Sequence, residues 1–348
     1  MSAFPIVVSP RRARHVTRVA VSVVLLVALA IPFFMTAFSV FQVSLILALA
    51  IGVLGLNLLV GYGGQVSLGH SFFIAVGGYT SAVLMADHGW NFFATLIPVA
   101  LFSGGAGLLL GFPALRLRGL YLALATLALA LSTGPLLRRF EGLTGGVQGV
   151  IVPTPDWLRD SPLGKDASVY YIVLAAMLLV TWLVSRITSG YSGLALAVIK
   201  QNEIVARSQG VDTARWKTAL FGASGMLAGL GGAFYVLAIG FIAPQSVGVM
   251  LSIFLLAGVV MGGLGSVWGA LFGAAIVHLL PQYAADVNQG LSGMVFGVAI
   301  IAVMFLMPGG FVQLFRTALG KLVQVRDEAR SAEEEMGNAG NLADARSG

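Results

Sequence analysis

Residues 40–62 read VFQVSLILALAIGVLGLNLLVGY, a run without a single charged side chain. A transmembrane α-helix needs about 20 predominantly apolar residues, so this run is long enough to cross a bilayer. A strand of a transmembrane barrel would instead alternate apolar and polar side chains over about 10 residues, and continuous apolar runs such as 23–34 do not alternate. The run therefore predicts a membrane-spanning helix.

Similar runs recur along the whole chain. With 40–62 they make nine segments with few or no charges, at 19–38, 40–62, 71–86, 92–112, 119–137, 168–185, 218–241, 251–280 and 291–307. The sequence therefore predicts an all-α, polytopic transmembrane helical bundle of about 8–10 spans.

The composition excludes a soluble globular protein. Hydrophobic residues make up 58% of the chain and charged residues 10%, against roughly 25% charged in a soluble domain. The mean hydropathy of +0.93 leaves too few polar side chains to cover a water-exposed surface. Cysteine is absent, which excludes a disulfide framework, a thiolate nucleophile and an iron–sulfur site in this chain.

Basic residues set the predicted orientation, because positively charged loops stay in the cytoplasm. Residues 1–18 form a basic amino-terminal tail, and the apolar run after it lacks a small-residue cleavage site, so an uncleaved first helix is favoured over a signal peptide. Counting crossings from a cytoplasmic tail places the loop 138–167 in the periplasm and the segment 187–217 in the cytoplasm. The membrane domain spans 19–315.

The carboxyl end adds a constraint. The tail 316–348 begins with basic residues and should be cytoplasmic, whereas plain crossings would leave it outside. Residues 251–280 would form a helix about 45 Å long, against about 30 Å of hydrocarbon, and Gly262–Gly269 interrupts them. We expect a re-entrant pair of half-helices that enters and leaves on the outer side. Residues 327–348 have the composition of a disordered segment.

Irregular backbone within a membrane survives where protein or a water-filled cavity satisfies its polar groups, so broken helices point to a transport path. The second such stretch is Gly61–His70, which shares a Gly-Gly-x-x-Ser pattern with Gly262–Gly269. The alternative is that these glycines only let helices pack closely. The candidate pathway residues are Gly63, Gly64, Gln65, Ser67, Gly69, His70, Gly262, Gly263 and Ser266.

No enzyme or stand-alone pump motif accompanies them. The histidines and acidic residues form no cluster with metal-ligand spacing, and no Walker A sequence is present, so we expect no catalytic residue, metal or cofactor in this chain. His70 and His278 are the intramembrane ionisable candidates. A hydrogen-bonded packing role is favoured for each over a proton relay.

The cytoplasmic segment contains a predicted amphipathic helix over 193–210. An apolar stripe combines Leu196, Ile199, Val205 and Ala206, and Gly210 would end the helix. Two interpretations remain open: a helix that lies on lipid headgroups, or one that docks in a groove of another subunit.

Three stretches resemble one family. They are GYGGQVSLGH (61–70), RLRGLYLA (116–123) leading to TGG (144–146), and NEIVARSQG (202–210) followed by 262–269. Together they resemble the larger of the two permease subunits of branched-chain (hydrophobic) amino acid ABC importers, over about residues 40 to 310.

The resemblance implies partners and residue roles. The chain would pair with a paralogous permease as a heterodimer in the bacterial inner membrane, receive substrate from a periplasmic binding protein, and be driven by two cytoplasmic ATPases that carry ATP and Mg. Membrane lipid is a further partner and nucleic acid is not. The segment with Glu203, Ala206, Arg207 and Gly210 looks like the ATPase-coupling loop, with one residue more between Glu and Gly than the usual Glu-Ala-Ala-x-x-x-Gly.

The chain departs from the family at two positions, and other substrates and another class of transporter remain possible interpretations. Relatives often carry acidic residues where this chain has Leu131 and Phe254. Similar permeases also carry urea, short amides or aromatic acids. The alternative from another class is a channel or secondary carrier that works alone.

Overall fold

The computed structural model describes residues 6–8, 22–23, 25–117, 119–287, 297–298, 301–302, 305, 310 and 323–325. Two compact units divide the chain, Met1–Phe34 with Gln313–Gly348 and Met35–Val312. In the first unit, β1 (Ile6–Val8) pairs in parallel with β4 (Val323–Val325), and residues Leu25–Phe34 are helical. Most of the predicted span 291–307 and most of both predicted tails lie outside the described residues.

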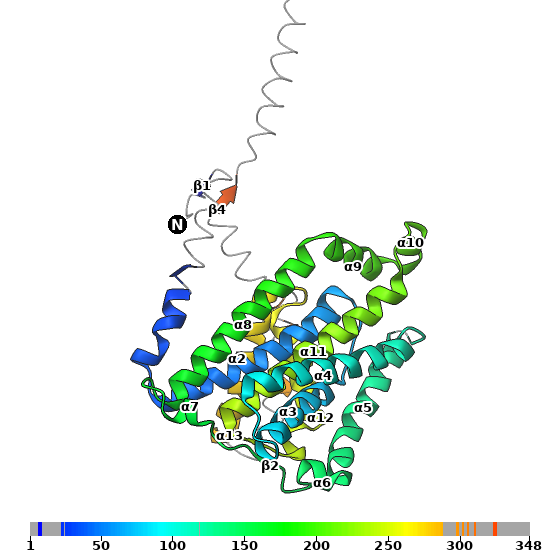
Figure 1. Cartoon of the computed structure of the whole chain (residues 1–348). Helices are drawn as coiled ribbons and strands as arrows, with labels where there is room; N and C mark the ends of the chain where they lie inside the picture. The colour runs from blue at the N-terminus through cyan, green and yellow to red at the C-terminus, as the bar shows by residue number, and fades with distance from the viewer. Residues whose placement is uncertain are drawn as a thin grey trace, which may run out of the picture. The chain divides into compact units, whose positions relative to one another are not determined.

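The second unit is a bundle of helices (Figure 1). Its apolar helices are α2 (Ala37–Asn57), continued by the π-helical η1 (Leu58–Tyr62), α3 (His70–Ala86), α4 (Phe92–Ala114), α5 (Leu120–Arg139), α8 (Lys165–Ser189), α11 (Thr213–Ile239), α12 (Val249–Gly262) and α13 (Val267–Val287). Within the described residues, five helices are long and apolar enough to cross a membrane, namely α2 with η1, α4, α5, α8 and α11. The predicted polytopic helical bundle is confirmed.

Short elements connect these helices. They are α6 (Glu141–Thr144), β2 (Val150–Ile151), α7 (Asp156–Arg159), α9 (Tyr191–Gln201), α10 (Glu203–Ser208), β3 (Phe241–Ile242) and the 3-10 helix η2 (Pro244–Val247). β2 pairs antiparallel with β3, with Val150 opposite Ile242. The loop after α5 and the segment after α11 therefore lie at the same end of the bundle.

The core lies around α2 and α11. Of their most apolar stretches 83% and 78% are buried, against 22% in α4 and 28% in α5, so the last two have broad apolar faces that no described residue covers. Glycines allow α11 to approach its neighbours, since a Cβ at Gly231 would meet the backbone of Ala48 and Gly52 at about 3 Å. Close packing therefore explains many of the glycines outside the two predicted breaks.

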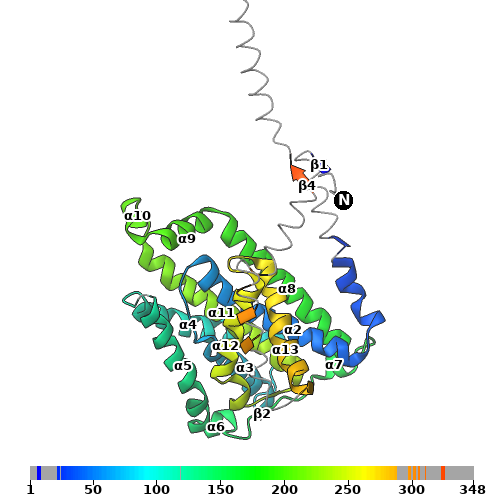
Figure 2. The same cartoon turned by 180° about the vertical axis from the view of Figure 1, so that it is seen from behind.

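The predicted interruption near 262–269 is present, although it is shorter. α12 ends at Gly262 and α13 begins at Val267, so only residues 263–266 leave the helix. The two helices fold back on each other, with Gly258 against Gly273 and Gly262 against Gly269. Figure 2 shows this hairpin beside α2. His278 near the end of α13 contacts Gln42 near the start of α2, so the hairpin turn points toward η1.

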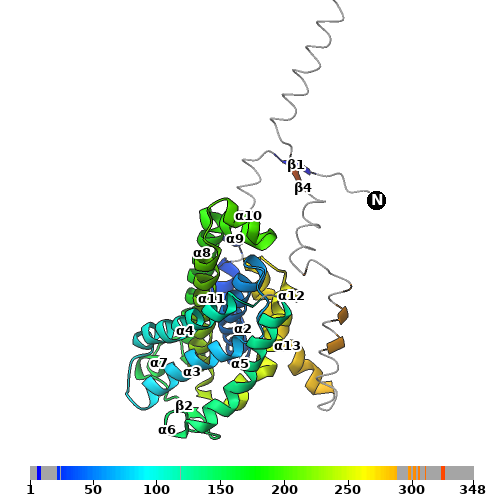
Figure 3. The same cartoon turned by 90° about the vertical axis from the view of Figure 1, so that its right-hand side faces the viewer.

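The bundle has two distinct ends (Figure 3). α9 and α10 lie at one end, and α6 and β2 lie at the other. The placement of 138–167 and 187–217 on opposite sides of a membrane stays a prediction. The assignment of the α9–α10 end to the cytoplasm stays a prediction.

The prediction of one helix over 193–210 is wrong. The helix breaks at Asn202, whose side-chain oxygen accepts hydrogen bonds from the backbone N–H groups of Ile204 at 2.9 Å and Val205 at 3.4 Å. Asparagine is a preferred N-cap because it satisfies these free donors, and here it starts α10. Val205 is 43% exposed and does not join the buried stripe of Leu196, Ile199 and Ala206.

Candidate translocation and coupling site

The first break, Gly63–Gly69, separates η1 from α3. Backbone N–H groups of Gly63, Gly64 and Gln65 bond back to the carbonyls of Leu58, Val60 and Leu59, each at 3.1 Å, and no helical bond follows. Gly64 has φ +67°, a conformation that glycine adopts without steric cost. The chain therefore leaves the helix at Gly64, between two apolar helices.

Polar side chains behind this break are buried and bonded to one another. His70 Nε2 lies 2.7 Å from Ser224 Oγ, and Ser224 Oγ donates to the Gly55 carbonyl at 2.6 Å. Because Ser224 uses its proton on Gly55, the bond to His70 needs the ring proton on Nε2, and Ser67 Oγ can donate to Nδ1 at 3.4 Å. Ser67 and His70 are fully buried in this cluster. The hydrogen-bonded packing interpretation of His70 fits these contacts.

Two more helices hold the same break. Thr126 Oγ1 on α5 accepts from the Leu68 N–H at 2.9 Å, and Gly69 lies against Thr126. Ser252 Oγ on α12 accepts from the Ser71 N–H and donates to Ser71 Oγ, both at 2.8 Å. The first turn of α3, whose N-cap Gly69 has no side chain to bond it, is thus capped from α12.

Asn57 joins the two breaks. Its Oδ1 accepts from the Gly265 N–H at 2.9 Å, and its Nδ2 donates to the Ser266 carbonyl at 2.7 Å. Gly61 packs directly against Gly265, and a Cβ at Gly61 would collide with its backbone. Asn57 is not among the candidate residues predicted from the sequence. It is a fully buried amide in a charge-free apolar run, and polar side chains in such runs are energetically costly and mark functional sites in membranes.

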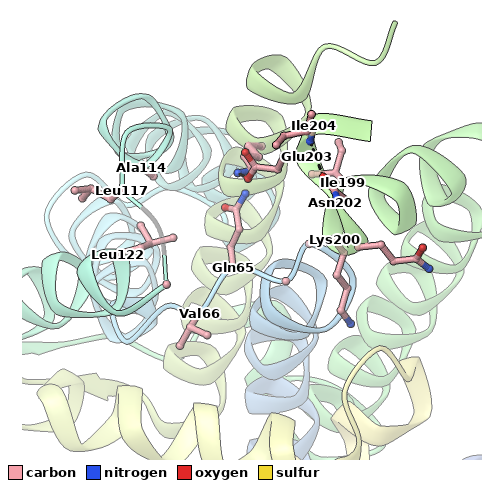
Figure 4. Close-up of a pocket in the computed structure, with 15 residues that line it drawn as sticks. Gln65, Val66, Ala114, Leu117, Leu122, Ile199, Lys200, Asn202, Glu203 and Ile204 are labelled. Atoms are coloured by element: carbon pink, nitrogen blue, oxygen red, sulfur yellow. Dashed lines mark hydrogen bonds and ion pairs between the residues drawn. The ribbon is translucent and has the colours of Figure 1, made fainter. Parts of the chain in front are cut away.

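A pocket of about 340 Å³ opens beside the first break, at the α9–α10 end (Figure 4). It is lined by Gly63 to Val66, the ends of α4 and α5, residues of α9 and α10, and Lys217. Gln65 is 8% exposed, and its Oε1 has no hydrogen-bond partner in the described structure. A buried amide oxygen without a partner costs free energy, so this position favours a donor group of a solute.

The candidate pathway residues therefore fall into three groups. Gly63, Gly64 and Gln65 line the pocket, whereas Ser67, Gly69 and His70 lie packed behind it. Gly262, Gly263 and Ser266 belong to the hairpin, where Ser266 Oγ accepts from the Gly269 N–H at 3.3 Å. The structure brings the two breaks together, but only the first group lines the pocket.

The candidate coupling residues surround a partly buried ion pair. Glu203 pairs with Lys217, and Arg207 lies 4.0 Å from Glu203 while its Nε donates to Thr213 Oγ1 at 3.0 Å. Ala206 is fully buried, so it supports α10 from inside. Ile204, which the sequence analysis did not select, is 78% exposed and presents an apolar side chain at the tip of this end.

Lys200 links the coupling segment to the first break. Its Nζ donates to the Gly61 carbonyl at 2.6 Å, and Figure 4 shows its side chain running down beside the ribbon that carries Gln65. Within the described residues, no three His, Cys, Asp or Glu side chains converge on a metal-sized site. The polar side chains that line the pocket are amides, two lysines and one carboxylate, Glu203.

Comparison with known proteins agrees with this arrangement. Residues 35–304 match the family described as "Branched-chain amino acid transport system / permease component". The high-affinity branched-chain amino acid transport system permease proteins LivM of Salmonella typhimurium and Escherichia coli are each 31% identical over 318 residues, which cover 85% of this chain and 75% of the relative. The autoinducer 2 import system permease protein LsrC of Klebsiella pneumoniae is 31% identical over 176 residues, 46% of this chain and 47% of the relative. No solved structure matches the chain.

The family match covers well over half of the chain, and the bundle, the two breaks and the coupling segment all lie within the matched residues. The ATPase activity of such transporters belongs to other subunits, as expected for a chain without a nucleotide-binding motif. The chain belongs to the family of permease components of ABC-type branched-chain amino acid transport systems.

Proposed function

We propose that this chain forms one half of the pathway for leucine, isoleucine and valine in an ATP-driven importer. A paralogous permease would supply the other half, two cytoplasmic ATPases carrying ATP and Mg would drive it, and a periplasmic binding protein would deliver the substrate. Gln65 carries the proposal, because it lines an open pocket and its buried amide oxygen has no hydrogen-bond partner in the described structure. An amino group of a passing solute would complete its hydrogen bonding.

The pocket also suits the apolar part of such a solute. Leu117, Leu122 and Ile199 line it beside Gln65. Polar and charged side chains, among them Lys200, Glu203 and Lys217, make up much of the remaining lining. They would orient a zwitterionic solute whose apolar side chain contacts the three aliphatic residues. Gly63 and Gly64 would let the solute approach the backbone, while Ser67, Gly69 and His70 would join the path when the helices separate.

The movement of the ATPases would reach this chain through α9 and α10. The exposed Ile204 is suited to insert in a groove of the ATPase, with Glu203, Arg207 and Gly210 beside it and Ala206 supporting them. Docking of this kind would use an apolar anchor surrounded by charges. The lipid-surface interpretation of the segment is the competing outcome.

Reconstitution tests the proposal. Proteoliposomes with this chain, its paralogous permease, the ATPases and the binding protein should take up leucine only when ATP is supplied on the cytoplasmic side. Flux through this chain alone would instead show a channel or secondary carrier. Competition by urea, short amides or aromatic acids, without competition by isoleucine and valine, would assign the transporter to another substrate.

Glu203→Arg tests the coupling segment. The variant places a cation beside Lys217, so α10 should shift, and uptake should fall while the complex still assembles and hydrolyses ATP. The double variant Glu203→Arg with Lys217→Glu restores opposite charges and serves as the control. Recovery in the double variant would assign the loss to the ion pair, and persistent loss would assign it to contact with the ATPase. Unchanged uptake in Glu203→Arg would exclude this segment from coupling.

A further inference from the structure

The Gly61 carbonyl lies at the carboxyl end of η1, and its hydrogen-bond donor comes from another helix. The last carbonyls of a helix have no partner within it, and here the closing bonds go to Leu58, Leu59 and Val60. The Gly61 oxygen is instead capped by Lys200 Nζ at 2.6 Å, from a helix 139 positions away in the sequence. A cation at a helix carboxyl end is favourable, and a charge-assisted hydrogen bond is among the stronger polar contacts in proteins.

Gly61 also touches the second break. Gly61 packs on Gly265. One turn earlier, the Asn57 side chain forms hydrogen bonds with the backbone of Gly265 and of Ser266. No Cβ fits between Gly61 and Gly265. The hairpin turn is therefore fixed to the same helix end that Lys200 holds.

Lys200 also sits next to the coupling residues. It belongs to the last turn of α9, directly before Asn202 and Glu203. Leu196 and Ile199 anchor α9 by burial, so the helix is not free to swing independently of the bundle. A displacement imposed on α10 would reach Lys200 through only a few residues of ordered backbone.

We propose that Lys200 and Asn57 are positioning residues that tie α9 to both helix breaks, so that α9, the end of η1 and the hairpin turn move as one body. This inference rests on the proposed function, in which α9 and α10 receive the ATPase movement. Lys200 transmits that movement to Gly61, and Asn57 passes it to Gly265 and Ser266. The pocket beside Gln65 would then open or close with the ATPase cycle, because its walls belong to this body and to α4 and α5.

Substitution of Lys200 is the first test. In the assembled transporter, Lys200→Met keeps the aliphatic stem but loses the bond, so leucine uptake per ATP hydrolysed should fall on the order of tenfold, within the range of coupling between sites in proteins. ATP hydrolysis itself should persist. Lys200→Arg retains a donor and should recover most of the coupling, which loss of the fold would not do. Equal uptake per ATP in Lys200→Met and the parent would overturn the proposal.

A disulfide supplies the second test, because the chain contains no cysteine. A Cβ at Gly64 would lie 3.6 Å from Lys200 Cβ, within the range of disulfide geometry. Gly64→Cys with Lys200→Cys should be uncoupled when reduced, and oxidation should restore uptake by replacing the lost bond with a covalent one. Gly64→Cys alone shows the cost of a side chain at φ +67°. Failure of oxidation to restore uptake, when the disulfide has formed, would contradict movement as one body.

A distance measurement separates this inference from the proposed substrate. Spin labels at Leu194→Cys on α9 and Leu264→Cys in the hairpin turn, both exposed positions, report the distance between the two elements. The distance should be the same without nucleotide and with ADP and vanadate trapped on the ATPases after hydrolysis, and should differ between these states when Lys200→Met is added. A change in the parent, or no change in the variant, overturns the inference. Absence of leucine uptake in the parent would refute only the proposed function.

Discussion

The two helix breaks look alike in sequence but are held in different ways. The first, Gly63–Gly69, is fixed by side chains that come from three other helices: Thr126 on α5, Ser224 on α11 and Ser252 on α12. The second, between Gly262 and Val267, is fixed by backbone contact between glycines of α12 and α13, with polar help from Asn57. One break depends on many weak bonds and the other on few close contacts.

This difference predicts how each break responds to change. Side-chain hydrogen bonds can exchange partners through rotation, so the first break can alter its shape at small cost. The backbone contact between α12 and α13 is either intact or lost, because protein interiors are too densely packed to accommodate intermediate gaps. The hairpin should therefore behave as a rigid wedge, and the first break as the adaptable wall of the pocket.

The hairpin contact is where a single change should have the largest effect. Gly262→Leu would drive a side chain into the backbone of Gly269 and Gly273, so the helices must separate. Overpacking typically costs about 1–3 kcal/mol, and a clash with backbone belongs at the upper end of that range. We expect the purified chain to lose its folded fraction in detergent, measured by thermal unfolding and size-exclusion chromatography.

Gly134→Leu is the matched control. Gly134 lies inside α5 with open space around it, so the same substitution should leave the melting temperature of the isolated chain nearly unchanged. If Gly262→Leu melts like Gly134→Leu, the close approach of α12 and α13 is not what holds the second break.

Asn57→Leu should have the next largest effect. It leaves the Gly265 N–H and the Ser266 carbonyl without their partner in a buried site, at a cost of about 2 kcal/mol. Thermal unfolding of the isolated chain measures it. Asn91→Leu removes an exposed N-cap of α4 and should cost only about 1 kcal/mol, so the difference between the two asparagines reports the burial. Equal losses of stability in the two variants would mean that the burial of Asn57 adds nothing to its contribution.

The helices themselves could be read from the sequence. A charge-free run such as 40–62 needs no tertiary information, because the bilayer selects for length and apolarity alone, and α2 with η1 occupies 37–62. The break at Gly263 was predictable for a similar local reason, since the apolar run was too long for one crossing and contained clustered glycines. The loop 138–167 likewise contains only short elements.

The contacts of the site could not be read in the same way. Asn57 became important only when the hairpin turn reached it from 209 positions away, and Lys200 only when α9 folded back on Gly61. The sequence placed Gln65, Ser67 and His70 together as pathway residues, yet the chain direction after Gly64 leaves Gln65 at the pocket and turns the other two into the core. Helix rotation, which depends on the whole bundle, decides such details.

The smallest expected effect belongs to the first break. Ser252→Ala removes the acceptor of the Ser71 N–H and should lower stability by about 1 kcal/mol, since Thr126 and Ser224 still hold the break. Ser132→Ala removes a hydroxyl that only bonds the Ala128 carbonyl of its own helix, and should change stability by less than about 0.5 kcal/mol. Thermal unfolding of both variants measures the difference. A loss in Ser252→Ala as large as that in Asn57→Leu would mean that the two breaks are equally rigid, and the pocket would then need another source for its movement.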